Sequence, residues 1–458
     1  MINNVLRPYE SYIDTGMDWL EVIPAHWEKI SLRGITELSN KRYGLRNDLE
    51  LLSVYREFGV VRKNSRDDNH NVESVDLSNY KYVDKGYLVL NKMKMWQGSL
   101  GISKYEGIVS PAYIVCKIKG NINFKYLHLL LRSPKYKTIY NRISYGVRVG
   151  QWDMRYDDFK KINLFIPPKL EQDQIVKYLD HQLVKINKFI KAKKKLIAVL
   201  KEQKQVIINE AVTKGLDSNV KMKPSGIEWF GNVPEHWECF RVKNIVRNVS
   251  LNTANNNGLQ YIGLENVESW SSRLINLKEN FQFESQAKLF MCGDILFGKL
   301  RPYLAKVITT CFDGVCSGEF LVLRTNKDIN PMYIEHILKS KKIIDIISSS
   351  TYGAKMPRVE WSFIGNLKIY LPTQISEQNG IVDYLSNIST SFDNSIVKIK
   401  KEIELIQEYK NSLISDVVTG KVDVRNIVID EAKDEIAENT DFDEELIDKE
   451  VLEAEDGD

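Results

Sequence analysis

One stretch of the sequence has the spacing of a phosphate-binding loop. Residues 293–299, GDILFGK, fit the pattern G-x-x-x-x-G-K, in which backbone N–H groups and the lysine hold the phosphates of a nucleotide. The next residue is Leu300, where such a loop needs Ser or Thr to hold magnesium, and the similar segment 86–92 has Asn91 in place of the second glycine. The segment also opens an apolar, strand-like run. It therefore favours a turn before a strand over a nucleotide site.

Histidines and cysteines give no stronger case for catalysis. His26 and His236 each lie in a Pro-x-His-Trp-Glu box without partners spaced for metal binding or acid–base chemistry, which favours a structural role for the box. Cys311 and Cys316 lack the nearby histidines of a zinc site. Neither G-x-G-x-x-G nor the Asn-Pro-Pro-aromatic tetrad of amino-methyltransferases occurs. The sequence therefore predicts no catalytic site, no metal and no cofactor in this chain.

Basic and aromatic residues interleave in four segments, a pattern that favours DNA binding. Lys and Arg neutralise phosphates, whereas Arg, Gln and Asn read base edges through paired hydrogen bonds. One such segment is typical of a solvated turn, but these four form two similar pairs between the halves of the chain. The predicted DNA-contacting residues are Lys92, Lys94, Trp96, Gln97, Arg142, Ser144, Tyr145 and Arg148 in the first half, and Lys299, Arg301, Tyr303, Thr351, Tyr352, Lys355 and Arg358 in the second.

Charge is divided unevenly along the chain. The 458 residues include 64 basic and 61 acidic ones, a net charge of +3. Residues 430–458 carry 15 acidic residues and 2 lysines, so the remaining body has 62 basic and 46 acidic residues, a net charge of +16. A basic body suggests a polyanionic partner, although a merely soluble surface would have a similar composition. The acidic tail is expected to be disordered, and three roles stay open for it: solubility, mimicry of DNA, or contact with a basic partner.

Composition also limits the class of protein and its compartment. Hydrophobic residues make up 43% and charged residues 27%, as in globular proteins. Five cysteines without a C-x-x-C pair argue against a disulfide scaffold. No apolar run is long enough to span a membrane, and the start, MINNVLRPYE, lacks the pattern of a secretory signal. We therefore expect a cytoplasmic protein with no membrane partner.

The body of the chain is one unit of about 205 residues written twice. Residues 15–28, TGMDWLEVIPAHWE, match residues 225–238, SGIEWFGNVPEHWE, at a distance of 210 positions. Residues 171–179, EQDQIVKYL, match residues 377–385, EQNGIVDYL, at a distance of 206. Two copies, unlike the many short repeats of a solenoid, predict two domains related by a pseudo-twofold axis.

Each copy combines a globular part with a long helix. Strand-like runs, such as those at 87–90 and 320–323, are followed by short helical patterns, such as Phe124 to Arg132, and together they predict α/β domains. Residues 171–213 contain neither Pro nor Gly, and their apolar residues recur in the heptad alternation of a coiled coil. We expect the two long helices to pack antiparallel on each other, the alternative being that each packs on its own domain. The predicted coiled-coil residues are Ile186, Ile190, Ile197, Leu200 and Ile207, with Phe392, Ile396, Ile403, Ile406 and Leu413 in the second copy.

At this point the sequence resembles the specificity subunit of a type I restriction–modification system. The resemblance covers about residues 15–425. It depends on the doubled [IV]-P-x-H-W-E box, the segment LFGKLRPYLAKV at 296–307, and the doubled E-Q-x-x-I-V-x-Y-L opening of the long helices. It also depends on the Gly-Asp-Ile-Leu strand start at 293–296, and there the first copy departs from the pattern because Gly86-Tyr87 replaces Gly-Asp. The acidic tail is not part of the pattern.

The resemblance implies a DNA-recognition subunit that catalyses nothing itself. Two target-recognition domains would each read one half of a split double-stranded DNA site, and the coiled coil would set the spacer. Two methyltransferase subunits, which use S-adenosylmethionine, would dock on this framework, and motor-nuclease subunits would join for cleavage. The alternatives are a coiled-coil protein-interaction scaffold without DNA recognition and an enzyme built from the two repeats. The predicted boundaries are 1–165 for the N-terminal segment and first recognition domain, 166–220 for the first long helix, 221–370 for the second recognition domain, 371–425 for the second long helix and 426–458 for the tail.

Overall fold

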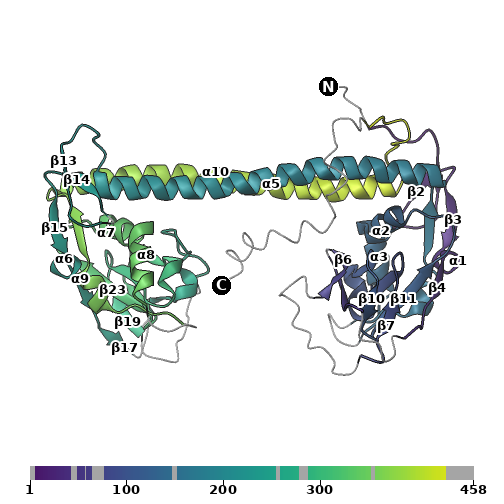
Figure 1. Ribbon diagram of the computed structural model, residues 1–458, viewed down its shortest axis with the longest axis horizontal. Coiled ribbons are helices and arrows are strands. Elements are labelled where there is room, and N and C mark those ends of the chain that lie inside the picture. The colour runs from purple at the N-terminus through teal and green to yellow at the C-terminus, as the bar shows by residue number, and fades with distance from the viewer. Residues whose placement is uncertain are drawn as a thin grey trace. The chain divides into compact units, whose positions relative to one another are not determined.

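The computed structural model divides the chain into two compact units. Unit 1 comprises Met1–Ala192 and Lys401–Gly457, and unit 2 comprises Lys193–Lys400 with Asp458. Each unit therefore holds one globular domain, one part of α5 (Lys169–Lys214) and one part of α10 (Ile375–Val418) (Figure 1). The structure describes residues 6–42, 49–56, 58–63, 77–146, 152–228, 230–253, 258–277, 287–351 and 356–429, so the acidic tail from residue 430 onward lies outside the described residues.

The domain of unit 1 is built around a four-stranded antiparallel sheet in the order β4-β11-β8-β9. Strand β11 reads YIVCKI, and its apolar, mostly β-branched residues are buried between two neighbouring strands. Ile114 of β11 pairs with Leu90 of β8. The strands of this sheet are β4 (Thr36–Leu38), β8 (Leu88–Asn91), β9 (Leu100–Ile102) and β11 (Tyr113–Ile118).

Four two-stranded sheets and several short helices complete the domain of unit 1. The strand pairs are β1 (Tyr12–Asp14) with β2 (Val22–Pro24), β3 (Glu28–Ser31) with β12 (Asn163–Ile166), β5 (Leu52–Tyr55) with β6 (Gly59–Arg62), and β7 (Lys81–Val83) with β10 (Gly107–Val109). The helices are α1 (Leu32–Ile35), the 3₁₀ helix η2 (Lys92–Gln97), α2 (Phe124–Arg132), α3 (Pro134–Ile143) and α4 (Tyr156–Phe159).

The domain of unit 2 has the same central sheet, with strands in the order β16-β23-β20-β21. Its second sheet differs from unit 1, because four strands join in the order β17-β19-β22-β18 and β18 runs parallel to β22. The central strands are β16 (Val246–Val249), β20 (Ile295–Gly298), β21 (Val307–Thr309) and β23 (Phe320–Thr325). The second sheet contains β17 (Asn252–Thr253), β18 (Gln260–Ile262), β19 (Ala287–Phe290) and β22 (Gly314–Cys316).

Most of the remaining elements of unit 2 repeat those of unit 1. Helices α2 and α7 both begin after an asparagine, Asn123 or Asn330, whose side chain accepts hydrogen bonds from two N–H groups of the first turn. The strand pairs are β13 (Met222–Pro224) with β14 (Asn232–Pro234) and β15 (Glu238–Arg241) with β24 (Lys368–Leu371). The helices are α6 (Val242–Ile245), η3 (Leu264–Asn266), η4 (Pro302–Leu304), α7 (Pro331–Leu338), α8 (Lys341–Ser349) and α9 (Trp361–Asn366).

These elements confirm the predicted fold class of two α/β domains with two long helices. The G-x-x-x-x-G-K segment supplies strand β20, so its second glycine ends a buried strand and does not begin a helix. A glycine with positive φ follows each long helix within two residues, Gly215 after α5 and Gly420 after α10. A Cβ atom added at Gly420 would lie 2.4 Å from Pro24 Cδ, so the close approach of the chain also requires glycine there.

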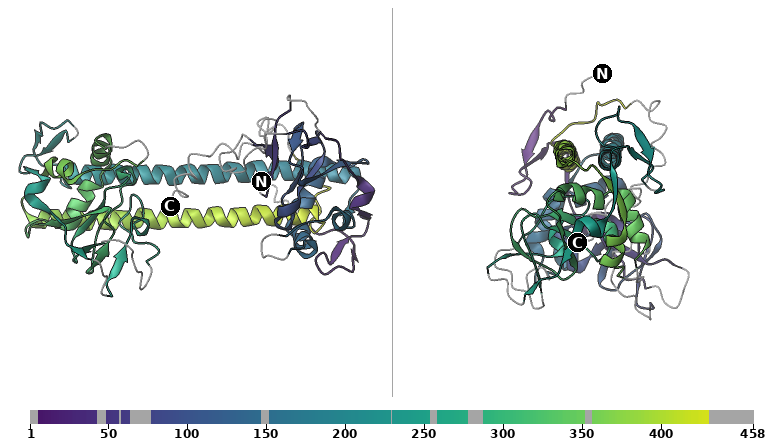
Figure 2. Two further views of the ribbon diagram at one scale, coloured as in Figure 1. Left: turned by 90° about the horizontal axis from the view of Figure 1, so that it is seen from below. Right: turned by 90° about the vertical axis from the view of Figure 1, so that its left-hand side faces the viewer.

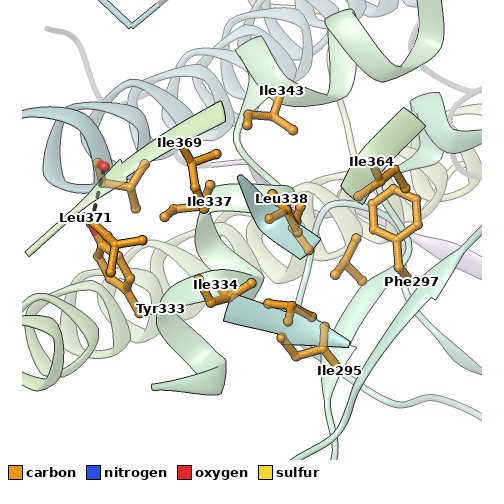
Figure 3. Packing of buried hydrophobic residues seen from close by; sticks show 14 of the residues in the cluster. Ile295, Phe297, Tyr333, Ile334, Ile337, Leu338, Ile343, Ile364, Ile369 and Leu371 are labelled. Atoms are coloured by element: carbon orange, nitrogen blue, oxygen red, sulfur yellow. Dashed lines mark hydrogen bonds between the residues drawn. The ribbon is translucent and has the colours of Figure 1, made fainter. Parts of the chain in front are cut away.

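The long helices are part of the core of each unit. In unit 2, Ile208 and Val212 of α5 and Ile381 and Leu385 of α10 belong to one buried cluster with residues of β20, β23, α7 and α8. Figure 3 shows part of this cluster, with Ile337 and Leu338 of α7 beside Ile369 of β24. Burying one such side chain contributes about 1.5–3 kcal/mol. In unit 2, the end of α5 and the start of α10 are therefore anchored to the domain by apolar packing.

Segments of α5 and α10 also lie side by side and antiparallel within each unit (Figures 1 and 2). In unit 1, Lys410 Nζ donates to Asn187 Oδ1 at 3.1 Å, and in unit 2 Lys204 Nζ donates to Asp393 Oδ1 at 2.8 Å. These two contacts occupy the same positions of the repeat, because Asn187 and Asp393 are 206 residues apart, as are Lys204 and Lys410. The residue numbers of each contacting pair also sum to 597, which defines the register of the helix pair.

Candidate nucleic-acid interface

A buried carboxylate at the start of α5 joins this helix to the domain of unit 1. Trp27 Nε1 donates to Glu171 Oε1 at 2.9 Å, and the Tyr9 hydroxyl donates to the same oxygen at 2.7 Å. His26 Nε2 lies 2.7 Å from Glu171 Oε2. Burial, together with the carboxylate, raises the pKa of Tyr9. We call this set of contacts the helix clasp.

Unit 2 contains an equivalent helix clasp, made of two contacts, at the start of α10. Trp237 Nε1 donates to Glu377 Oε1 at 2.9 Å, and His236 Nε2 lies 2.8 Å from Glu377 Oε2. In both units the next residue after the glutamate, Gln172 or Gln378, accepts from the backbone N–H of the asparagine before α2 or α7. The Pro-x-His-Trp-Glu box thus positions a helix, and the repeated Glu-Gln at the helix start is its partner.

The first candidate loop of unit 1 is the 3₁₀ helix η2, which follows strand β8. Lys92 Nζ lies 2.6 Å from Asp153 Oδ2, and the Lys92 carbonyl accepts from the Met154 N–H at 3.0 Å. The Trp96 ring lies 5.1 Å from the Trp152 ring, centroid to centroid. Lys94 is exposed and Gln97 is half-buried. Segment 152–154 therefore lies against this loop.

The second candidate loop of unit 1 begins at the end of α3. Arg142 donates from one guanidinium nitrogen to both carboxylate oxygens of Asp18, each at 2.8 Å, so its charge faces the N-terminal segment. Ser144 Oγ donates to the Tyr140 carbonyl at 2.7 Å. Tyr145 is exposed, and the Arg155 guanidinium lies 5.9 Å from the centre of its ring. Arg148 lies outside the described residues.

Unit 2 places its first candidate loop at the end of strand β20. The Lys299 N–H donates to the Glu319 carbonyl at 2.8 Å, and the Lys299 carbonyl accepts from the Val359 N–H at 3.1 Å. Arg301 is exposed, has a positive φ of 50°, and donates its N–H to the Pro357 carbonyl. Tyr303 is exposed as well.

The second candidate loop of unit 2 meets the first through Arg358. Arg358 Nη2 donates to Glu319 Oε1 at 2.9 Å. The backbone of Arg358 also forms an isolated antiparallel β-bridge with that of Leu300. Thr351 Oγ1 donates to the Ser348 carbonyl at 2.8 Å at the end of α8. Tyr352 and Lys355 lie outside the described residues. The structure thus brings Lys299, Arg301 and Arg358 together.

Sequence reasoning missed one lysine in each unit that lies beside these loops. Lys81 Nζ donates to the Tyr113 carbonyl at 2.5 Å, and Lys288 Nζ donates to the Phe320 carbonyl at 2.7 Å. Burial lowers the pKa of both lysines, and the nearby charge of Lys92 or Lys299 lowers it further. The two lysines are 207 residues apart, so the repeat itself was the signal that could have identified them.

All ten residues predicted for the coiled coil are buried or half-buried on α5 or α10. Of those on α5, Ile186 and Ile190 are buried, and Ile197, Leu200 and Ile207 are half-buried. Of those on α10, Ile396, Ile403 and Leu413 are buried, and Phe392 and Ile406 are half-buried. By contrast, apolar residues outside the heptad positions, such as Phe189, Leu196 and Val206, are exposed.

The described part of the chain offers no site for a metal ion or a membrane span. No group of three or more His, Cys, Asp or Glu residues within it has the geometry to hold a metal. None of its helices combines the length and apolar character that crossing a bilayer requires.

Comparisons with known proteins give a consistent result. The model of the type I restriction modification DNA specificity domain matches residues 24–199 and again residues 234–405. The chain is 25% identical to the type I restriction enzyme MjaVIII specificity subunit of Methanocaldococcus jannaschii, over 73% of this chain and 79% of that protein. It is 21% identical to the EcoDI specificity subunit of Escherichia coli, over 71% and 76%. One chain of a solved type I R-M system has the same fold, with a TM-score of 0.61, 13% identity and coverage of 87% and 99%.

Proposed function

Because the chain belongs to the type I restriction–modification DNA specificity family, with two copies of the family domain, we propose that its two domains each read one half of a bipartite DNA site. The observation that supports this most directly is the doubling of the basic loops. Lys92 and Lys299 occupy equivalent positions, each at the end of a central strand and each in contact with the second loop of its unit. Two copies of one binding surface suit a target of two half-sites.

Within each unit the loops supply two kinds of contact. Exposed basic side chains such as Lys94 and Arg301 bind phosphates and set the register of the protein on the duplex. Half-buried groups such as Gln97 and Trp96 are held by the fold and contact base edges. Arg142 has a different task in this proposal, because its contact with Asp18 directs it to the N-terminal segment.

The antiparallel helices set the spacer between the half-sites. Their seam is lined by buried apolar residues, and the contacts Lys410–Asn187 and Lys204–Asp393 fix the register. Helix length then determines the distance between the domains. The helices also provide the surface on which two methyltransferase subunits dock, with motor-nuclease subunits joining for cleavage. The chain itself contributes recognition in the cytoplasm, and S-adenosylmethionine is bound by the methyltransferase partner.

Shortening both helices together tests the spacer. Extending the register of the contacts Lys410–Asn187 and Lys204–Asp393 pairs residues 193–199 with residues 398–404, so deleting both segments removes one heptad from each helix. The helix pair becomes roughly 10 Å shorter, which corresponds to about three base pairs at 3.4 Å per step. Mapping methylated sites in the genome of a host that carries the complex should show the same half-sites with a shorter spacer. Altered half-sites, or an unchanged spacer, would contradict the proposal.

Two further measurements test DNA recognition directly. Exchanging residues 29–165 for those of a relative should alter one half-site and leave the other intact. Affinity for DNA should fall steeply as salt rises, because each neutralised phosphate releases bound counterions. A chain that copurifies with other proteins but neither with a methyltransferase nor with DNA would instead support a protein-interaction scaffold.

A further inference from the structure

A carboxylate lies among the basic residues of the candidate loops in each unit. In unit 1, Asp153 contacts Lys92 through Oδ2, while its Oδ1 has no hydrogen-bond partner in the described chain. In unit 2, Glu319 contacts Arg358 through Oε1, and its Oε2 likewise has no partner among the described residues. A covered oxygen without a donor is costly, by about 1–3 kcal/mol. Such groups therefore call for a functional explanation.

The two carboxylates occupy the same place although they come from different segments. Asp153 precedes Met154, whose N–H binds the Lys92 carbonyl, and Arg358 precedes Val359, whose N–H binds the Lys299 carbonyl. Asp153 and Arg358 are thus structural equivalents with opposite charge. Each unit nevertheless has one carboxylate where the two loops meet. In unit 2 it is supplied by the turn at 317–320, which closes through the Phe320 N–H and the Ser317 carbonyl.

The carboxylate of Glu319 is not needed to build that turn. The equivalent turn of unit 1 closes in the same way, through the Tyr113 N–H and the Ser110 carbonyl, and has Ala112 in place of Glu319. The side chains of Asp153 and Glu319 are 38% and 31% exposed, although their unpartnered oxygens are covered. A ligand on the loops therefore meets the exposed part of each side chain, and the carboxylate must turn to present the covered oxygen.

The chemistry of DNA limits what a carboxylate can accept from it. Ionised Asp and Glu only accept hydrogen bonds, and phosphates and most groove atoms of the bases are acceptors too. In the major groove the donors are the amino groups at cytosine N4 and adenine N6. A carboxylate among phosphate-binding lysines therefore repels most bases and favours one that presents an amino group.

We infer that Asp153 in unit 1 and Glu319 in unit 2 each accept a hydrogen bond from the exocyclic amino group of cytosine or adenine, and so specify one base of each half-site. This inference rests on the proposed function, because it requires DNA on the loops. Lys92 and Arg358 each bind one oxygen of the carboxylate, and the base becomes the partner of the second oxygen once DNA docking uncovers it.

The test uses the full-length chain in complex with its methyltransferase subunits, acting on a DNA library with randomised half-sites. Asp153→Ala should relax base preference at one position of one half-site, on the order of tenfold, and leave the other half-site unchanged. Glu319→Ala, which installs the residue of unit 1, should do the same in the other half-site. Asp157→Ala and Asp345→Ala remove exposed carboxylates that pair with Lys160 and Lys341, and serve as matched controls for the change in charge.

The outcomes separate this inference from the proposed function. Sequence-specific methylation by the wild-type complex, with unchanged preferences in both alanine variants, overturns the inference and leaves the proposed function standing. Methylation without any bipartite preference in the wild type overturns both. Asp153→Asn and Glu319→Gln preserve size, so they report base preference even if an alanine variant folds poorly. A uniform loss of activity in these variants, without relaxation at a single position, shows that the carboxylates only shape the loops and overturns the inference.

Discussion

The two units use the same framework but stabilise it with different chemistry. In unit 2, Asp294 of the Gly-Asp strand start is buried and forms two 2.6 Å hydrogen bonds with Arg324. In unit 1 the equivalent residues are Tyr87 and Lys117, and the lysine lies 5.9 Å from the centre of the tyrosine ring. The departure of unit 1 from the repeated pattern is therefore a change of both partners. A position in the repeat specifies a contact, and several pairs of residues can make it.

The contact between a helix and the edge strand of the central sheet is also made by different residues in the two units. In unit 2, Glu335 accepts from the Thr309 N–H of β21 at 2.8 Å and from Lys339 Nζ at 2.8 Å. In unit 1, His128 accepts from the Ile102 N–H of β9 at 3.1 Å. The four residues match across the repeat, because Ile102 and Thr309, like His128 and Glu335, are 207 positions apart. In both units, a helix side chain accepts a hydrogen bond from a backbone N–H of the edge strand. The acceptor is a carboxylate in unit 2 and a neutral imidazole ring in unit 1.

The largest expected effect comes from breaking the buried ion pair between Glu335 and Lys339 in unit 2. Glu335 and Lys339 are each 4% exposed, so Glu335→Ala leaves a buried ammonium without its carboxylate. The unfolding free energy of unit 2 should fall by about 3–5 kcal/mol, measured by hydrogen exchange in denaturant. Asp345→Ala, in the exposed pair with Lys341, should cost about 0–1 kcal/mol. The double variant Glu335→His with Lys339→Ala tests whether a histidine can replace the carboxylate as acceptor for the Thr309 N–H. If it lowers the unfolding free energy as much as Glu335→Ala does, the two acceptors are not equivalent.

Acid should weaken unit 2 through His336, at a position where unit 1 has Leu129. Burial lowers the pKa of His336 from 6.5 to about 4. The unfolded chain therefore binds a proton below pH 6.5 that the folded chain does not, so this stabilisation is complete above pH 6.5 and is lost as pH falls toward 4, by up to about 3 kcal/mol. His336→Leu installs the equivalent residue of unit 1, Leu129, and should flatten that part of the pH profile of unit 2. An unchanged profile would assign the acid sensitivity elsewhere.

The helix clasp should be stronger in unit 1 than in unit 2. Glu171 binds three side chains and is 6% exposed, whereas Glu377 binds two and is 32% exposed. Each buried donor left without an acceptor costs about 1–3 kcal/mol. Glu171→Ala should therefore destabilise its unit by about 1–2 kcal/mol more than Glu377→Ala does. Urea titrations followed through the fluorescence of the clasp tryptophans would show equal losses if the difference in burial were unimportant.

The smallest effect concerns the contacts across the helix pair. Lys204 faces Asp393 in unit 2, and Lys410 faces Asn187 in unit 1. Both contacts involve a lysine ammonium, so the carboxylate adds an ion pair where the amide gives only a hydrogen bond, a difference of about 0–1 kcal/mol for partly exposed groups. Asp393→Asn should lower the melting temperature slightly, and Asn187→Asp should raise it by a similar amount. Calorimetry of the two variants and their combination would reveal whether the contacts are as interchangeable as the repeat indicates.

The sequence by itself determined the duplication, the heptad seam and most central strands. Period and propensity are local properties, and they recur in both copies: the strand-like runs at 87–90 and 320–323 overlap strands β8 and β23, and the helical pattern from Phe124 to Arg132 coincides with α2. The apolar residues expected in the seam are buried or half-buried. The basic loops were also visible, because the repeat displays them twice.

Only the tertiary structure decided which polar groups meet. Glu171 contacts Trp27 across 144 positions, and Arg142 turns to Asp18 across 124. No local pattern encodes such pairings, since they depend on how helices and strands pack. The carboxylates of Asp153 and Glu319 come from non-equivalent positions, so even the repeat could not align them. Sequence periodicity determines which face of a helix or strand is buried. Which polar groups become partners depends on how those faces pack against each other in the folded protein.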